Sequence, residues 1–109
     1  MLWERIRKMP YGTEKRIDIR SIKVPWYFLQ TNPRVEKVKK YYDFYNKHGY
    51  LDKPITVKYR NKSTNILHNE YIRYLIIANE IDEYRKLHNI SKYEDIPRWL
   101  RTIPVRYIN

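Results

Sequence analysis

The chain of 109 residues is long enough for one compact domain and too short for two. Its 23 Lys and Arg residues exceed its 12 Asp and Glu residues, which gives a net charge of +11. The absence of cysteine excludes disulfides, thiol catalysis and zinc sites with thiolate ligands, and fits a reducing, cytoplasmic setting. Apolar runs are short and the first ten residues lack an apolar core, so we expect neither a membrane span nor a secretory signal.

The positive charge is concentrated in the first part of the chain. Residues 1–62 contain 16 basic and 6 acidic residues, a net charge of +10, whereas residues 63–109 contain 7 and 6, a net charge of +1. This polarity indicates an anionic partner, with nucleic acid first and an acidic protein or a membrane surface behind it. The alternative is that the lysine-rich surface serves only solubility, because charge alone carries no specificity.

In chain order, the pattern first predicts a basic N-terminal arm over residues 1–16, where Pro10 and Gly12 interrupt any periodicity. Apolar residues then recur with a period near two over residues 17–24, which predicts a half-buried strand with a bulge. The first helix is then expected to begin, with Asn32 as its cap and Pro33 in its first turn.

The next segments alternate between helical and extended patterns. Residues 35–47 predict an amphipathic helix closed by Gly49. Residues 51–59 and 65–68 predict two strands of a hairpin. A second helix is expected over residues 70–83, and its broad apolar face predicts that it is sandwiched between other elements.

The last part of the chain is the least regular. We expect a Ser-capped turn at Ser91 and a short helix that anchors Trp99 and Leu100 on the core. Residues 103–108 alternate well and predict a final strand, with Pro104 near its start.

The histidines, carboxylates and tyrosines, taken by themselves, do not indicate a metal site or a catalytic site. The three histidines are separated by twenty residues each, without the short spacings of metal sites, so we expect no metal ion. The neighbouring carboxylates at Asp82–Glu83 and Glu94–Asp95 point apart, and we expect no catalytic residues. Most of the 12 tyrosines fall at positions that suit a core, while a minority could stack on bases, as aromatic side chains do in single-strand binders.

The order of three short motifs resembles the ParB/sulfiredoxin-like superfamily, and within it the ParB N-terminal domain. A helix and Gly49 precede a Pro54-Ile55-Thr56-Val57 strand, Asn69-Glu70-Tyr71-Ile72-Arg73 stands at the next strand–helix junction, and Ile103-Pro104-Val105 opens the last strand. The resemblance covers residues 17–78 and 103–108, with residues 82–102 as an insertion into a domain of residues 17–109. It implies a small α+β domain, in which a mixed sheet packs against two main helices.

The resemblance also implies that the loop of residues 69–73, here called the signature loop, holds a nucleotide phosphate. Relatives act as CTP-dependent DNA clamps, DNA-cleaving enzymes or sulfinic acid reductases. The reductase reaction needs a cysteine in this loop, which the chain lacks, and the signature glycine is replaced by Glu70.

Two interpretations of this loop remain open. In the first, Asn69 caps the following helix and the carboxylate of Glu70 occupies its positive end, so that the anion site is filled from within. Replacing Glu70 by glycine would then increase anion affinity at a cost in helix stability. In the second, Arg73, Lys53 and Arg34 converge on a phosphate, because a guanidinium binds phosphate in a bidentate manner.

The leading prediction is a non-enzymatic, nucleic-acid-associated module that binds DNA or nucleotide phosphate. A phage or a plasmid is the expected source of such a module. The predicted phosphate-binding residues are Arg34, Lys37, Lys40, Lys53, Asn69, Glu70 and Arg73. No obligatory cofactor is expected, although a nucleotide remains open, as does the oligomeric state. The alternatives are a catalytic relative that hydrolyses nucleotide or DNA, and a protein-interaction module for an acidic partner. No membrane partner is expected.

Overall fold

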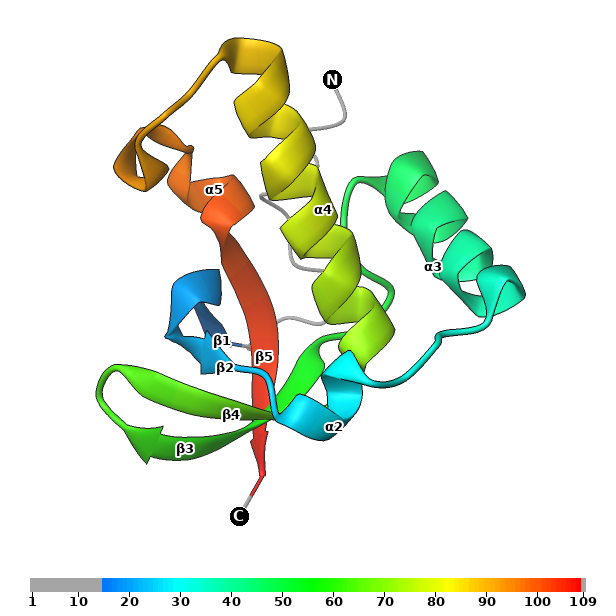
Figure 1. Cartoon of the computed structure of the whole chain (residues 1–109), viewed down its shortest axis with the longest axis vertical. Helices are drawn as coiled ribbons and strands as arrows, with labels where there is room; N and C mark the ends of the chain where they lie inside the picture. The colour runs from blue at the N-terminus through cyan, green and yellow to red at the C-terminus, as the bar shows by residue number, and fades with distance from the viewer. Residues whose placement is uncertain (1–14, 109) are drawn as a thin grey trace.

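The computed structural model describes residues 15–108, which form one α+β domain with a mixed five-stranded sheet (Figure 1). The strands are β1 (Lys15–Asp18), β2 (Ile22–Lys23), β3 (Ile55–Asn61), β4 (Thr64–Asn69) and β5 (Thr102–Ile108). The helices are α2 (Trp26–Leu29), α3 (Val35–His48), α4 (Tyr71–His88) and α5 (Arg98–Arg101), with short 3-10 turns η1 (Ile19–Ser21) and η2 (Tyr93–Asp95). Most of the predicted arm lies outside the described residues, but Lys15 and Arg16 belong to β1.

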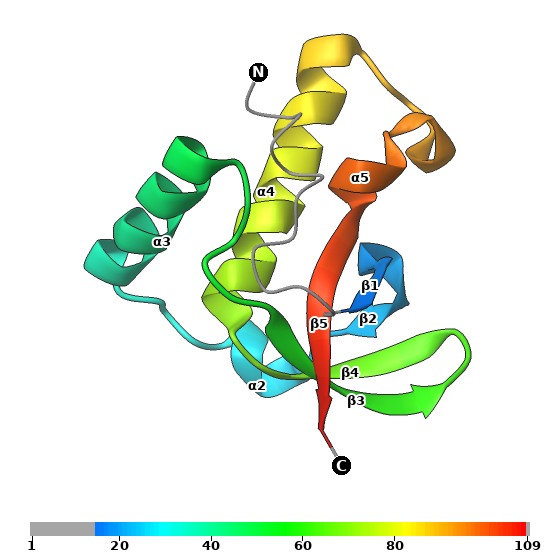
Figure 2. The same ribbon diagram turned by 180° about the vertical axis from the view of Figure 1, so that it is seen from behind.

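The sheet has the order β1-β5-β3-β4-β2. The predicted hairpin of β3 and β4 is confirmed as an antiparallel pair, and the last strand β5 enters the interior of the sheet beside β3, in parallel. The first strands of the chain therefore form both edges, β1 antiparallel to β5 and β2 parallel to β4. Figure 2 shows β5 running through the sheet from behind.

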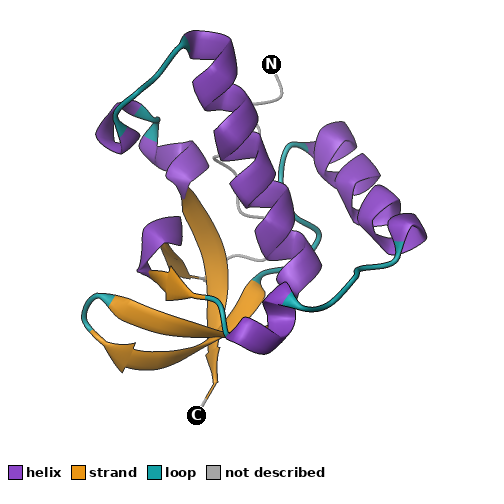
Figure 3. Ribbon diagram, viewed as in Figure 1, coloured by secondary structure: helices purple, strands orange, loops and turns teal. Residues whose placement is uncertain are grey.

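The core lies between the sheet and α4. Fully buried aliphatic residues from β3, β4 and β5 meet one face of α4, and Tyr45 of α3 and Leu100 of α5 close the sides. Figure 3 shows α3, α4 and α5 together above the strands. Helix α4 is thus sandwiched, as its broad apolar face predicted. Within residues 15–108, none of the helices has the length and hydrophobicity needed to cross a bilayer.

Several local predictions are corrected by the structure. The strand expected over residues 17–24 is broken by η1, because Asp18 accepts a hydrogen bond from the backbone N–H of Arg20 and turns the chain. Helix α3 begins at Val35, with Arg34 rather than Asn32 at the cap position. Gly49 closes α3 as predicted, in the left-handed conformation with φ 83°.

The C-terminal part also differs from the prediction. Helix α4 extends to His88, where Asn89 takes the left-handed conformation that ends a helix. No Ser91 cap forms, because Lys92 precedes η2. Pro104 is the third residue of β5, yet the ladder with β3 begins only at Val105, so no partner is lost on that side.

Candidate functional site

The signature loop is a tight left-handed junction between β4 and α4. A bulge precedes it, because Thr56 pairs with Asn69 and Val57 with Leu67, which leaves His68 unpaired. Glu70 then takes φ 72° and ψ 42°, a region that strongly favours glycine. The position at which the resemblance expects glycine has therefore kept a glycine-like backbone, although it carries a glutamate.

The predicted cap is corrected at this junction. Glu70 itself occupies the position before the first helical residue, and its carbonyl accepts the N–H of Tyr74 at 3.1 Å. The Asn69 side chain accepts the backbone N–H of Glu70 at 2.8 Å instead of an N–H inside the helix. Asn69 thus stabilises the turn, not the helix end.

Arg73 lies in the first turn of α4 and is almost fully buried, with 5% of its surface exposed. Its Nε and Nη2 atoms donate to the two carboxylate oxygens of Asp52, both at 2.6 Å, in a bidentate pair. Its Nη1 atom donates to the carboxylate of Glu70. The guanidinium also lies 3.9 Å from the centre of the Tyr41 ring, so one of its faces is covered.

These contacts fix the charges of the pair. Burial opposes ionisation of Asp52, but the hydrogen bonds and charge of Arg73 outweigh it and hold the pKa of that carboxyl below its usual range. Burial likewise opposes the charge on Arg73, yet Asp52 and Glu70 raise its pKa above the usual value. Both groups are therefore ionised at neutral pH, as a buried ion pair requires.

Lys53 completes the cluster of Asp52, Lys53, Glu70 and Arg73, which we call the acid–base cluster. Its Nζ atom lies 3.0 Å from the carboxylate of Glu70, whose side chain is only 14% exposed. The two carboxylates and two cations of the acid–base cluster thus balance. The Glu70 carboxylate thus contacts both Lys53 and Arg73, two of the residues predicted to bind phosphate.

A pocket of about 440 Å³ lies next to the acid–base cluster. Its walls include Phe28, Tyr41 and Tyr71, together with Lys37 from α3. Of the seven predicted site residues, five line this pocket: Lys37, Lys53, Asn69, Glu70 and Arg73. The remaining two, Arg34 directly before α3 and Lys40 within it, are exposed and do not line the pocket.

Sequence reasoning missed two residues that hold Arg73, namely Asp52 and Tyr41. An arginine on an apolar helix face is expected to be buried and therefore to need a carboxylate partner. Asp52 was recognisable as that partner, because it directly precedes Lys53, which was already predicted to lie near the loop. Tyr41 falls at a position of α3 that suits packing, and the sequence gives no sign of its contact with Arg73.

Sequence reasoning also passed over the tip of the β3–β4 hairpin. No acidic residue occurs between Asp52 and Glu70, and Lys58, Arg60 and Lys62 are all exposed. The ladder with β5 ends at Lys58 and that with β2 begins at Asn65, so the tip projects as a two-stranded ribbon. The ribbon is a second exposed basic surface.

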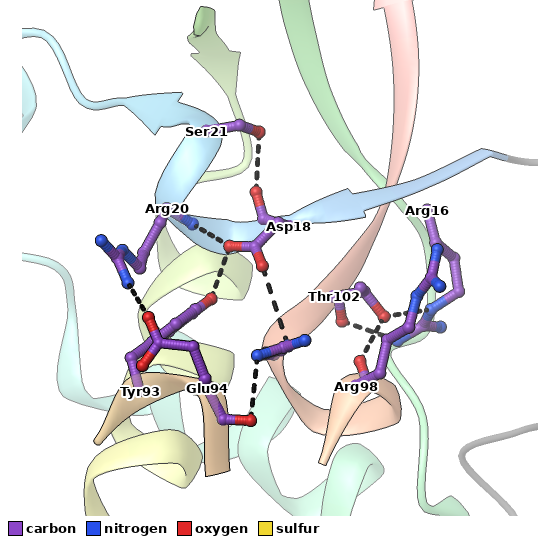
Figure 4. A network of polar contacts seen from close by, with 9 residues as sticks. Arg16, Asp18, Arg20, Ser21, Tyr93, Glu94, Arg98 and Thr102 are labelled. Carbon is purple, nitrogen blue, oxygen red and sulfur yellow. Dashed lines mark hydrogen bonds and ion pairs between the residues drawn. The ribbon is translucent and has the colours of Figure 1, made fainter. Parts of the chain in front are cut away.

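A polar network on the other side of the fold ties β1 and η1 to the predicted insertion (Figure 4). Tyr93 donates its hydroxyl hydrogen to the carboxylate of Asp18, and burial, followed by this hydrogen bond, raises the pKa of Tyr93. Glu94 lies 3.8 Å from Arg20. Arg16 donates to the Thr102 carbonyl at 2.7 Å, which joins β1 to the start of β5. These contacts are internal, so we assign the network a structural role.

No group of three or more metal-binding side chains occurs among residues 15–108. No protein-family model and no curated protein sequence matches the chain. Among solved structures, the chain is similar to sulfiredoxin from Arabidopsis thaliana, with a TM-score of 0.54 and 21% sequence identity. The likeness covers 89% of this chain and 85% of that one. It confirms the predicted fold: the chain has the ParB/sulfiredoxin-like fold.

Proposed function

We propose that the chain is a non-enzymatic nucleic-acid-binding module that contacts phosphates through exposed cations, while the anion site of its signature loop is closed by Glu70. One observation carries the proposal. Arg73 is buried, with donors on all three nitrogens engaged by two carboxylates, whereas Arg34, Lys37 and Lys40 are exposed. The exposed cations, and not Arg73 of the signature loop, are therefore available to contact a phosphate.

The exposed cations of α3 support this proposal in detail. Lys37 and Lys40 are three residues apart and share one helix face. Neither makes an ion pair with a described carboxylate, in contrast to Lys39, whose Nζ atom lies 2.8 Å from Asp43. Removing Lys39 would therefore break an internal pair, and it is a poor choice for a test. The charges of Lys37 and Lys40 are therefore not used within the described part of the fold and are available to an external partner.

A catalytic role is disfavoured by the same contacts. The polar loop residues that a hydrolase would use are Asn69 and Arg73, and the structure engages both with neighbours in the fold. An arginine that stabilises a developing phosphate charge must be free to contact it. Here the carboxylate of Glu70 repels an approaching phosphate at close range.

The test is a titration with labelled DNA and RNA oligonucleotides at two salt concentrations. Phosphate contacts release counterions, so affinity should fall steeply as salt rises. The variant Lys37→Glu/Lys40→Glu should bind roughly tenfold more weakly or worse, with no change in sequence preference. The matched control is Lys92→Glu/Arg98→Glu, which changes the net charge equally at two exposed sites whose side chains form no ion pair with a described carboxylate.

Two outcomes of this titration would contradict the proposal. Absence of binding to any nucleic acid at low salt would overturn the proposal. Equal weakening in the control variant would show that overall charge, not the α3 surface, governs binding, and would overturn the assignment to α3.

A further inference from the structure

We infer that the exposed aromatic surface of α2 stacks on the bases of single-stranded nucleic acid, so that the partner is a single strand and not a duplex. This inference rests on the nucleic-acid-binding function proposed above and names the class of nucleic acid. Three features of α2 support it: exposed aromatic rings, an aromatic contact that holds the helix in place, and a surrounding segment without acidic residues.

The first feature is exposure. Trp26 is 69% exposed, Tyr27 51% and Leu29 66%, and α2 contains no buried residue. Large aromatic side chains are normally covered in a soluble domain, and neighbouring exposed ones mark an interaction site. Figure 1 shows α2 beyond the N-terminal end of α4, next to the loop that leads into α3.

The second feature is an aromatic anchor. Phe28 stacks on Tyr71 of α4 with ring centres 5.3 Å apart, and Tyr71 stacks on Tyr74 one turn along. This contact holds α2 in place from one side and leaves Trp26 and Tyr27 facing outward. Trp26 meets Tyr27 edge to face, at 86° and 6.1 Å, and Tyr27 in turn packs on Phe28 with ring centres 4.8 Å apart. Trp26, the more exposed of the two rings, is therefore the one we assign to stack on a base.

The third feature is charge. No acidic residue occurs between Asp18 and Glu36, whereas Lys23 and Arg34 are both exposed on either side of α2. Lys37 lines the pocket that also contains Phe28, so a cation lies beside the anchored ring. Aromatic rings interleaved with cations match a strand in which bases stack and phosphates alternate with them. An apolar protein partner would not require this excess of positive charge.

The geometry favours a single strand over a duplex because of where base faces are available. In a duplex the faces are covered by neighbouring base pairs, and only edges and phosphates are accessible. A single strand exposes its base faces to aromatic side chains, and each such stack contributes substantially to affinity.

The experiment compares an oligothymidylate of about 12 nucleotides with a duplex of the same length, by fluorescence anisotropy. Trp26→Ala should weaken single-strand binding by roughly tenfold, and Trp26→Phe should retain part of it. Leu29→Ala is the matched control, because Leu29 is equally exposed on the same helix but has no ring to stack, and it should change affinity little. Circular dichroism verifies that each variant folds.

Each outcome is decisive. Tighter binding of the single strand, lost in Trp26→Ala but not in Leu29→Ala, supports the inference. Duplex binding as tight as single-strand binding, with Trp26→Ala unchanged, overturns the inference and leaves the proposed function standing. Equal losses of single-strand binding in both variants overturn stacking, because they show that the contact with α2 does not depend on an aromatic ring. Absence of all nucleic-acid binding overturns both proposals.

Discussion

Glu70 combines a backbone conformation that suits glycine with a side chain that contacts two cations. A non-glycine residue in the left-handed region costs roughly 1–2 kcal/mol. The carboxylate offsets this cost through its contacts with Arg73 and Lys53. Backbone and side chain at this position therefore contribute to stability with opposite signs.

This opposition gives a prediction for Glu70→Gly and Glu70→Ala. Both variants lose the carboxylate, but only glycine adopts the left-handed conformation without penalty, so the glycine variant should be the more stable by about 1 kcal/mol. The helix-stability cost expected for glycine from the sequence does not apply, because Glu70 precedes the first helical residue. Urea unfolding of both variants measures the difference, and equal stabilities would contradict the prediction.

A second prediction concerns anion affinity at the same position. Glu70→Gly should bind inorganic phosphate or nucleotide triphosphate more tightly than the unaltered chain, because Lys53 and Arg73 lose a competing carboxylate. Calorimetry at low salt measures this affinity. Glu36→Gly removes an equal charge from an exposed position and should have little effect. An unchanged phosphate affinity in Glu70→Gly would show that the carboxylate is not the obstacle.

Asp52 predicts a dependence of stability on pH. Its pKa is lower in the folded protein than in the unfolded chain, so its stabilising effect is complete above the unfolded pKa and is lost as the pH falls through the folded pKa. Asp52→Asn should cost about 2 kcal/mol at pH 7, because Arg73 keeps only one close carboxylate. The variant should also lose less stability than the unaltered chain as the pH falls below the usual pKa of an aspartate, about 4. Identical acid sensitivity in urea unfolding would contradict this.

At the scale of elements, periodicity predicted α3, α4, the β3–β4 hairpin and β5. These segments are long or carry strong end signals, such as Gly49. The strand expected over residues 17–24 failed, because one hydrogen bond from the backbone of Arg20 to Asp18 outweighs a short apolar alternation. The start of α3 was also missed, since Asn32 and Pro33 suit a preceding turn as well as a helix cap.

The network around Asp18 gives a prediction at this scale. Tyr93→Phe removes the hydroxyl that links η2 to the end of β1 and should lower the free energy of unfolding by about 1 kcal/mol. Tyr59→Phe, at an exposed tyrosine of the hairpin, is the control and should change stability little. Urea unfolding measures both, and a neutral Tyr93→Phe would show that the link between β1 and the insertion contributes nothing.

At the scale of the whole molecule, the positive net charge indicates an anionic partner, whereas the fold determines which cations are available to it. Five of the seven residues predicted to bind phosphate line one pocket, since motif order identifies which loop meets which strand. The spacing of Glu70 and Arg73 allowed them to pair, but the sequence could not indicate the contacts of Arg73 with Asp52 and Tyr41, because these two residues approach it only in the folded chain. Whether an arginine of a motif is available to a ligand is a property of tertiary structure, not of the motif.

The same reasoning predicts that the chain lacks enzymatic activity. It should show no sulfinic acid reductase activity, because it has no thiol, and it should hydrolyse nucleotide negligibly while Arg73 is held by carboxylates. Phosphate-release assays with and without divalent metal measure the second activity. Turnover that Arg73→Ala abolishes, in a variant that remains folded, would establish an enzyme instead.

The left-handed backbone at Glu70 has a genetic consequence. Both glutamate codons differ from a glycine codon by a single base, and the main chain already has the conformation that glycine prefers. A point mutation could therefore open the signature loop without any refitting of the surrounding strands. The closed loop is separated from an open one by one nucleotide, so selection for anion binding could gain or lose this site with little change elsewhere in the protein.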